Sequence, residues 1–185
     1  MTLSIVLGLV ALAVLYGILI YNKLVKARQL TEEGWSGIDV QLRRRSNLIP
    51  NLVEAVKGYM KHEKGLLEEV TKLRANAVAA ENAGPETRAA AESALSGGLL
   101  RLNAVMENYP NLKANENVMD LQNSLDEIED EIQLSRRYFN GAVRNNNVLV
   151  ESFPSNLVAN HFNFGNAEYF EIEDAAERAV PKVEL

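Results

Sequence analysis

Apolar side chains recur every three or four residues along most of the chain, and this spacing predicts long helices. Counting from Trp35 in alternating steps of three and four residues reaches Ala77, and eleven of the thirteen positions are apolar. The same count from Val118 to Phe153 finds nine of eleven positions apolar. The mean step of about 3.5 residues is the repeat of a helix-bundle seam. We therefore expect an all-α fold, an antiparallel bundle of three long helices plus a short C-terminal helix.

Pro50 lies inside the first stripe, but the phase of the stripe does not slip there. A new helix with Pro50 at its first position would need Ile49 as its cap, and isoleucine caps poorly. Asn47 could cap a restart instead, so two helices remain possible. We favour a single helix with a kink, in which the proline ring leaves the Ser46 carbonyl without its helical donor at a cost of about 3 kcal/mol.

Two further elements follow from proline and the apolar pattern. The stretch GPETRAAAESALSGGLLRLNAVMENYP predicts a third long helix, with Pro85 at its start. Pro154 should stop the late helix, and Ser155 is placed to cap a short helix over residues 156–161. The phenylalanine-rich segment from Phe153 onward has two interpretations. We favour a tail that folds back over the end of the bundle, and the alternative is a docking patch for a partner or another copy.

The N-terminal segment has no charged side chain from Thr2 to Asn22. A helix of this length crosses a hydrocarbon core of about 30 Å, and Tyr16 and Tyr21 would lie near the headgroups. A cleaved signal peptide is the alternative, but the stretch has no basic n-region and no small-x-small site near its end. We expect an uncleaved anchor that contacts the lipid bilayer through residues 3–21.

The basic residues that follow the apolar stretch indicate its orientation. Lys23, Lys26 and Arg28 come directly after it, whereas only the terminal amine precedes it. The positive-inside rule then places the N-terminus outside and the rest of the chain in the cytoplasm. The expected organisation is an anchor over residues 1–22, a long-helix bundle over 23–154, and a short helix with a tail over 155–185 that packs on or near the bundle.

Composition and motifs exclude several function classes. The net charge of −6 makes nucleic acid an unsuitable partner, and the absence of cysteine excludes disulfides and thiolate metal sites. The chain has two histidines, and HEKGLLEE lacks the second histidine of a zinc-protease helix. Neither histidine follows a glutamate by three residues, as a di-iron bundle requires. No phosphate loop, nucleophile elbow or dinucleotide fingerprint occurs. We expect no catalysis, no metal and no cofactor.

The arginine run at residues 43–45 raises a more specific question. Arg43 lies about 35 Å beyond Ile20 along a straight helix, which is several Debye lengths from a membrane surface. Arg45 also falls on the apolar seam, where a buried guanidinium needs an acidic or carbonyl partner, so an internal ion pair is expected. Ser135 and Asn146 are polar positions on the later seam that could fix helix register. The acidic group at residues 126–131 flanks Ile128 and should mostly face solvent.

Three motifs together resemble a known family. EEGWSGIDVQLRRRSNLIPNLVEAVKGYMKHE, LQNSLDEIEDEIQLSRRYFNGAVRNNN and FPSNLVA follow an N-terminal apolar stretch in this order, and this arrangement is similar to the LemA family of bacterial membrane proteins. The resemblance covers roughly residues 16–170 and implies a single-pass inner-membrane protein with a cytoplasmic antiparallel helical bundle. It implies no catalytic residues. Its pattern falls on Trp35, Arg44, Pro50, Asn51, Tyr59, Arg137, Tyr138, Asn140, Arg144, Pro154 and Asn156. Relatives often have a tyrosine after the Arg144 region, where this chain reads RNNNV.

The function expected from these features is that of a membrane-tethered scaffold or adaptor without catalysis. It would associate with itself or with other membrane-associated proteins. The first alternative is a ligand-sensing bundle with a polar pocket near Arg45 and Asn146, with Arg137 or Arg144 as a further candidate. An enzyme is the third hypothesis, and it would need a metal held by carboxylates such as Glu63.

Overall fold

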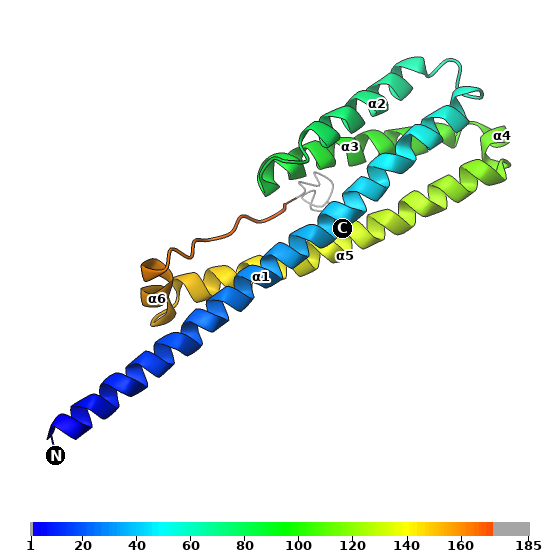
Figure 1. Ribbon diagram of the computed structural model, residues 1–185. Helices are drawn as coiled ribbons and strands as arrows, with labels where there is room; N and C mark the ends of the chain where they lie inside the picture. Colours follow the sequence, from blue (N-terminus) through cyan, green and yellow to red (C-terminus); the bar gives the residue numbers. More distant parts are fainter. Residues whose placement is uncertain (1, 172–185) are drawn as a thin grey trace, which may run out of the picture. The chain divides into compact units, whose positions relative to one another are not determined.

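The structure, a computed structural model, describes residues 2–171, and every regular element in that range is a helix (Figure 1). The elements are α1 (Thr2–Lys57), α2 (Lys64–Ala79), α3 (Pro85–Met106), α4 (Pro110–Lys113), α5 (Glu116–Glu151) and α6 (Ser155–His161). The predicted all-α fold is therefore confirmed. Helices α1 and α5 each contribute to two compact units. The first unit contains residues 2–37 and 135–169, and the second contains residues 38–134 with Phe170.

Helix α1 runs through Pro50 without interruption, so the prediction of one helix at this point is confirmed. A proline at position 50 removes the backbone donor that would bind the carbonyl of residue 46. The structure supplies a replacement, because Arg74 of α2 donates from Nε to the Ser46 carbonyl oxygen at 2.7 Å. A side chain of the second unit thus takes the place of the missing helical hydrogen bond.

The continuous apolar stripe did not predict where α1 ends. We expected the stripe to follow one helix as far as Ala77, and this was wrong, because α1 ends at Lys57 and α2 begins at Lys64. Gly58 follows the end of α1, and glycine is a poor helix former. Met60 then turns into the core with 1% of its surface exposed, whereas the stripe position Tyr59 is exposed.

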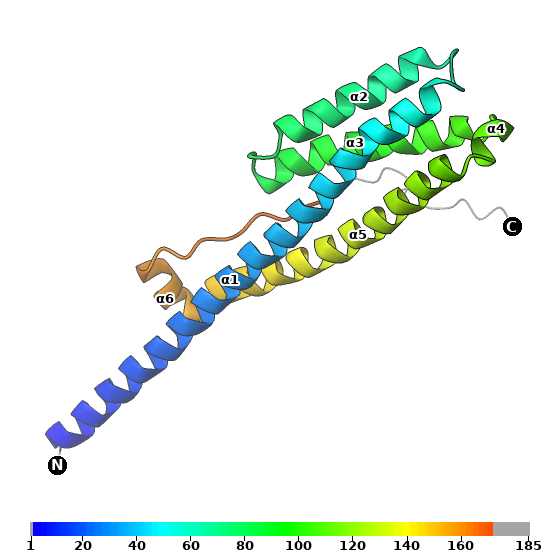
Figure 2. The ribbon, with the colours of Figure 1, turned by 45° about the vertical axis from the view of Figure 1, so that its right-hand side comes forward.

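The second unit is built around one apolar cluster from α1, α2, α3, α4 and α5. Figures 1 and 2 show α2 and α3 side by side, and Gly98 allows this close approach. A Cβ atom at Gly98 would lie 2.6 Å from Cδ1 of Leu73. Helix α3 begins at Pro85, as predicted. The cluster consists of Ile49, Leu52, Val56, Met60, Leu67, Val70, Ala77, Leu95, Leu102, Met106, Leu112 and Val118.

The first unit contains the apolar N-terminal part of α1, the C-terminal part of α5, helix α6 and the segment that follows it. Its apolar cluster joins Ile20 and Leu24 of α1 to Ala159 of α6 and to Phe164. Most of α1 before Ile20 is exposed in the structure, and this helix is long and apolar enough to cross a membrane. The N-terminal anchor predicted from the sequence therefore has the required helical form.

The start of α6 differs from the sequence prediction in one detail. Ser155 was expected to cap the helix, but it is the first helical residue and makes no capping hydrogen bond. Its hydroxyl instead donates to the Ser152 carbonyl oxygen at 2.9 Å. The hydroxyl is therefore directed back to the end of α5, and Pro154 occupies the position before the helix. The part of the predicted tail over residues 172–185 lies outside the described residues.

Two glycines of α1 provide a matched test of packing in the first unit. A Cβ atom at Gly34 would lie 3.0 Å from the Cα atom of Phe139, whereas one at Gly37 would meet nothing within 4 Å. Alanine is favoured over glycine inside a helix by about 1 kcal/mol. We expect Gly37→Ala to raise the free energy of unfolding by about 0.5–1 kcal/mol. Gly34→Ala should lower it by about 1 kcal/mol, because α5 must move away.

Chemical denaturation of the full chain in detergent micelles, followed by circular dichroism at 222 nm, measures both effects. Equal effects of the two substitutions would contradict the close approach of α1 and α5 at Gly34.

Candidate functional site

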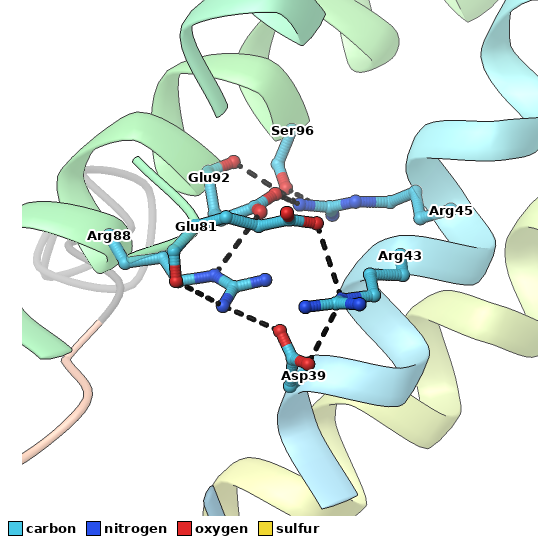
Figure 3. A network of polar contacts seen from close by, with 7 residues as sticks. All are labelled: Asp39, Arg43, Arg45, Glu81, Arg88, Glu92 and Ser96. Atoms are coloured by element: carbon cyan, nitrogen blue, oxygen red, sulfur yellow. Dashed lines mark hydrogen bonds and ion pairs between the residues drawn. The ribbon is translucent and has the colours of Figure 1, made fainter. Parts of the chain in front are cut away.

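The most unusual site in the second unit is a cluster of buried charged side chains (Figure 3). Arg45 of α1 lies at its centre with 1% of its surface exposed. Its guanidinium donates to Glu92 of α3 at 2.6 Å, to Glu129 of α5 at 2.5 Å and to the Ser96 hydroxyl at 2.8 Å. One arginine therefore connects three helices, and the internal ion pair predicted for this seam position is confirmed.

A second buried arginine extends the cluster. Arg88 of α3 is 2% exposed and lies 2.6 Å from Asp39 of α1. Its Nε atom is 3.9 Å from Glu92, and its Nη1 atom donates to the Glu81 carbonyl oxygen at 3.1 Å. Glu92, which is 3% exposed, thus lies between the two buried arginines. These contacts join α1 to the beginning of α3.

The outer edge of the cluster is open to water. Arg43 of α1 is more than half exposed and lies 3.0 Å from Asp39 and 3.3 Å from Glu81 (Figure 3). Contacts of this exposed kind contribute little to stability. We define the ion-pair network as Asp39, Arg43, Arg45, Glu81, Arg88, Glu92, Ser96 and Glu129.

The charges of the ion-pair network nearly cancel, because three arginines face four carboxylates. Burying a charge costs several kcal/mol, and a buried pair offsets that cost only when the geometry is good and both partners are present. The network therefore adds little to stability as a whole, but removing one of its buried members is costly. Its chemistry is that of a register-setting contact: Arg45 fits opposite Glu92 and Glu129 in one alignment of the three helices.

Sequence reasoning found the buried arginine but missed most of its partners. Arg88 and Glu92 stand four residues apart in an alanine-rich helix, and this spacing places them on one face. That pattern is the signal that could have found them. Glu129 was included in an acidic group expected to face solvent. Glu129 instead pairs with Arg45. The other four members of the group are exposed, as expected: Asp126, Glu127, Asp130 and Glu131.

A second set of predicted residues lies together in the first unit, where α1 meets α5. The Trp35 ring is tilted against Phe139, with centroids 5.4 Å apart. The Tyr138 ring lies beside Gly34, so that a Cβ atom there would be 3.2 Å from it. Arg137 is exposed on the same helix. These aromatic residues therefore pack α1 against α5 within the first unit.

Asn146 and Asn147 hold the segment that follows α6. Asn146, 4% exposed, donates from its side-chain amide to the Gly165 carbonyl oxygen at 3.2 Å. Asn147 accepts from the Ala167 backbone N–H at 2.8 Å and donates to the Ala167 carbonyl oxygen at 3.0 Å. The RNNNV stretch that departs from the expected family pattern thus fastens residues 165–167 to α5. Asn147 was not singled out from the sequence.

Several predicted residues have roles apart from these clusters. Arg44 is exposed and donates to Gln41 at 3.0 Å. Asn51 and Arg144 are exposed on α1 and α5, and Asn140 is half-buried on α5. Pro154 and Asn156 lie at the beginning of α6 and are half-buried. Arg45 belongs to the second unit and Asn146 to the first, and each has its own partners within that unit.

Two tyrosine hydroxyls make hydrogen bonds in the second unit: Tyr59 lies in the turn between α1 and α2, and Tyr109 lies between α3 and α4. The Tyr59 hydroxyl accepts from the Asn115 amide at 3.1 Å, and the Tyr109 hydroxyl donates to Glu63 at 3.3 Å. Burial raises the pKa of the Tyr109 phenol above its ordinary value, and the nearby Glu63 carboxylate raises this pKa further. Glu63, considered above as a metal ligand, is therefore a hydrogen-bond acceptor here. Within the described residues, no group of three or more His, Cys, Asp or Glu side chains is arranged to hold a metal.

The raised pKa of Tyr109 predicts a loss of stability at high pH. The unfolded chain releases the phenol proton near the ordinary value of 10.0, whereas the folded chain retains it to higher pH. The stabilisation is complete below that value and is lost as the pH rises through the folded pKa. We expect Tyr109→Phe to weaken the fall in unfolding free energy above pH 10, relative to the unmodified chain. Denaturation curves at several pH values measure the difference, and parallel pH profiles would contradict the prediction.

Comparison with known protein sequences finds a matching family model and several relatives. The sequence model of the LemA family matches residues 34–185. The magnetosome protein MamQ 1 of Paramagnetospirillum magneticum is 27% identical over 184 aligned positions, covering 86% of this chain and 68% of the relative. The magnetosome protein MamQ of Magnetospirillum gryphiswaldense is 25% identical with the same coverage. Protein LemA of Metamycoplasma hominis is 23% identical over 166 positions, covering 89% of this chain and 74% of the relative.

Proposed function

Because the chain belongs to the LemA family, as its motifs predicted, we propose that it is a membrane-anchored helical scaffold that binds copies of itself or other membrane-associated proteins. The observation that carries this proposal is the extent of α1. The apolar stretch and the bundle share this one helix of 56 residues, with no loop between them. A bundle joined to its anchor in this way suits a protein whose task is to hold partners near a membrane.

The proposed location is the bacterial inner membrane, with a single span, the N-terminus outside and the bundle in the cytoplasm. Two features support it. The apolar part of α1 has the length and hydropathy of a span, and Lys23, Lys26 and Arg28 follow it. All three basic side chains belong to the first unit, directly beyond the last apolar residues.

Two observations favour a scaffold over an enzyme or a ligand sensor. The relatives bear no enzyme names. The buried seam arginine, which the sensor hypothesis would use to bind an anion, already has two carboxylate partners within the chain. A ligand anion would have to displace Glu92 or Glu129 from Arg45, and this competition lowers its affinity.

Self-association and partner binding can be tested in native membranes with a photo-crosslinking amino acid. The sites to substitute are exposed large side chains on two helices, Leu100 on α3 and Leu134 and Tyr138 on α5. We expect a crosslinked dimer or a crosslinked membrane protein from at least one of them. Leu102, two residues from Leu100 but 1% exposed, is the matched control and should give intramolecular products. Monomeric products at all three exposed sites, with single-step photobleaching in nanodiscs, would count against the scaffold.

A further inference from the structure

Helix α6 and the segment after it cover the last turn of the apolar stretch of α1 (Figure 2). Ile20 is 8% exposed because it packs in the cluster with Ala159 and Phe164. The Tyr21 ring makes edge contacts with Phe162 and Phe164, at centroid distances of 4.8 and 5.6 Å. All of these residues belong to the first unit. The end of the candidate span is therefore in direct contact with the α6 region.

The α6 region also presents large apolar side chains that remain more than half exposed. Phe153, Leu157 and Phe162 are 79%, 61% and 53% exposed. Residues 152–167 contain no Asp, Glu, Lys or Arg, although a stretch of this length would hold about four at the 24% charged content of the chain. The exposed apolar side chains and the absence of charged residues both lower the free-energy cost of placing this segment in an apolar environment. Several large exposed apolar side chains within one short segment indicate an interaction surface.

The depth of this surface relative to a bilayer follows from its contact with Tyr21. The apolar side chains of α1 are exposed as far as Leu19, and the cover by protein begins at Ile20. A bilayer that surrounds the exposed part must therefore end close to Tyr21. Phe162 touches the Tyr21 ring and lies at the same depth. Phenylalanine, tyrosine and leucine are residues that enter the boundary between headgroups and acyl chains.

The neighbouring charges fit the same arrangement. The Arg28 guanidinium lies over the Phe164 ring at 5.2 Å from its centroid. This cation is two helical turns beyond Tyr21, on the side of the aromatic cluster away from the apolar stretch, where anionic headgroups would meet it. Asn147 fastens the returning segment to α5 and so holds α6 in place.

We propose that α6, with Phe153 and Phe162 at its ends, is a second membrane contact that inserts into the headgroup and acyl-chain boundary beside the span. The bilayer is the occupant of this surface because the surface is continuous with the exposed apolar side chains of α1. The inference rests on the proposed anchor, since a chain without a membrane-spanning α1 would hold α6 in water.

The chain has no cysteine, so single labels can be introduced without background. Leu157→Cys carrying a nitroxide, in the full chain in nanodiscs of zwitterionic and anionic phospholipid, reports collisions with oxygen and with a water-soluble nickel chelate. We expect Leu157 to show a several-fold higher oxygen-to-nickel ratio than Tyr138→Cys. Tyr138 is the matched control because it is 50% exposed and lies beside Gly34, about 21 Å beyond Ile20 along α1. Phe153→Cys is a second label site, used if the first variant does not fold.

A label at Leu9, within the apolar stretch, separates the possible failures. If Leu9 is reached by nickel, the anchor itself is wrong and the inference falls with it. If Leu9 lies in lipid but Leu157 and Phe153 are reached by nickel, the anchor stands and the second contact is overturned. If the α6 labels are shielded from both reagents, another protein copy covers them, and this result also overturns the inference.

Discussion

Arg45→Leu is expected to lower the free energy of unfolding by about 3–5 kcal/mol, because it leaves the buried Glu92 carboxylate without its closest cation. Glu92 is 3% exposed and lies 2.6 Å from Arg45 but 3.9 Å from Arg88. Water cannot replace the lost partner at so buried a site, and the remaining arginine is too distant to form a strong hydrogen bond. Urea denaturation of the full chain in detergent micelles, followed by far-UV circular dichroism, measures the loss.

The adjacent residue provides the control for this prediction. Arg44 is exposed and donates a hydrogen bond to Gln41, also at the surface. Arg44→Leu should therefore change the free energy of unfolding by less than about 0.5 kcal/mol. The double variant Arg45→Leu with Glu92→Leu should recover most of the loss, because a buried ion pair can be replaced by apolar side chains at little cost. Similar effects of Arg44→Leu and Arg45→Leu would show that burial of the Arg45–Glu92 pair does not determine the loss of unfolding free energy.

The same variants distinguish the scaffold from the ligand-sensing alternative. Phosphate or sulfate is expected to leave the melting temperature of the unmodified chain unchanged, because Arg45 is occupied by Glu92 and Glu129. An anion-dependent rise that disappears in Arg45→Leu would instead favour a sensor.

Pro50→Ala is expected to raise the free energy of unfolding by about 1–2 kcal/mol. Proline inside a helix costs about 3 kcal/mol relative to alanine, and Pro50 is exposed, so its removal sacrifices little packing. The gain is smaller than the full cost because Arg74 already supplies a charged hydrogen bond to the Ser46 carbonyl. The same denaturation experiment measures the change.

A double-mutant cycle tests whether Arg74 compensates for the proline. Arg74→Leu should cost about 1–2 kcal/mol in the unmodified chain, because the Ser46 carbonyl oxygen loses its donor. In the Pro50→Ala background that carbonyl regains a helical N–H, so the same change should cost about 1 kcal/mol less. Independent, additive effects would show that the Arg74 contact is unrelated to the proline.

The elements of the fold were predictable where apolar spacing alone decides the structure. The passage of α1 through Pro50 followed from the unbroken phase of the stripe, and the start of α3 followed from Pro85. The end of α1 was not predictable in this way. The chain turns at residues 58–63, between α1 and α2. Apolar positions continue at the same spacing before and after this turn, so the apolar spacing does not reveal it.

The candidate site was predictable only in part, for a related reason. The position of Arg45 on the seam indicated burial, and burial required a partner. The identity of that partner depends on which helices pack against Arg45. Acidic residues occur on several of the predicted helices, so the sequence alone did not show which of them pairs with Arg45. Asn146 and Asn147 illustrate the same limit, since they bind backbone groups of residues 165–167, which no side-chain pattern reveals.

The contact between Asn147 and Ala167 joins a side chain to the main chain. An amide that binds both the N–H and the C=O of one residue recognises features common to every amino acid except proline. Residue 167 can therefore be replaced by almost any amino acid without loss of these two hydrogen bonds. Asn147 cannot be replaced so freely, because a shorter side chain, or one with only a donor or only an acceptor, would lose at least one of them. The side-chain identity that this contact requires therefore lies on one side of it alone.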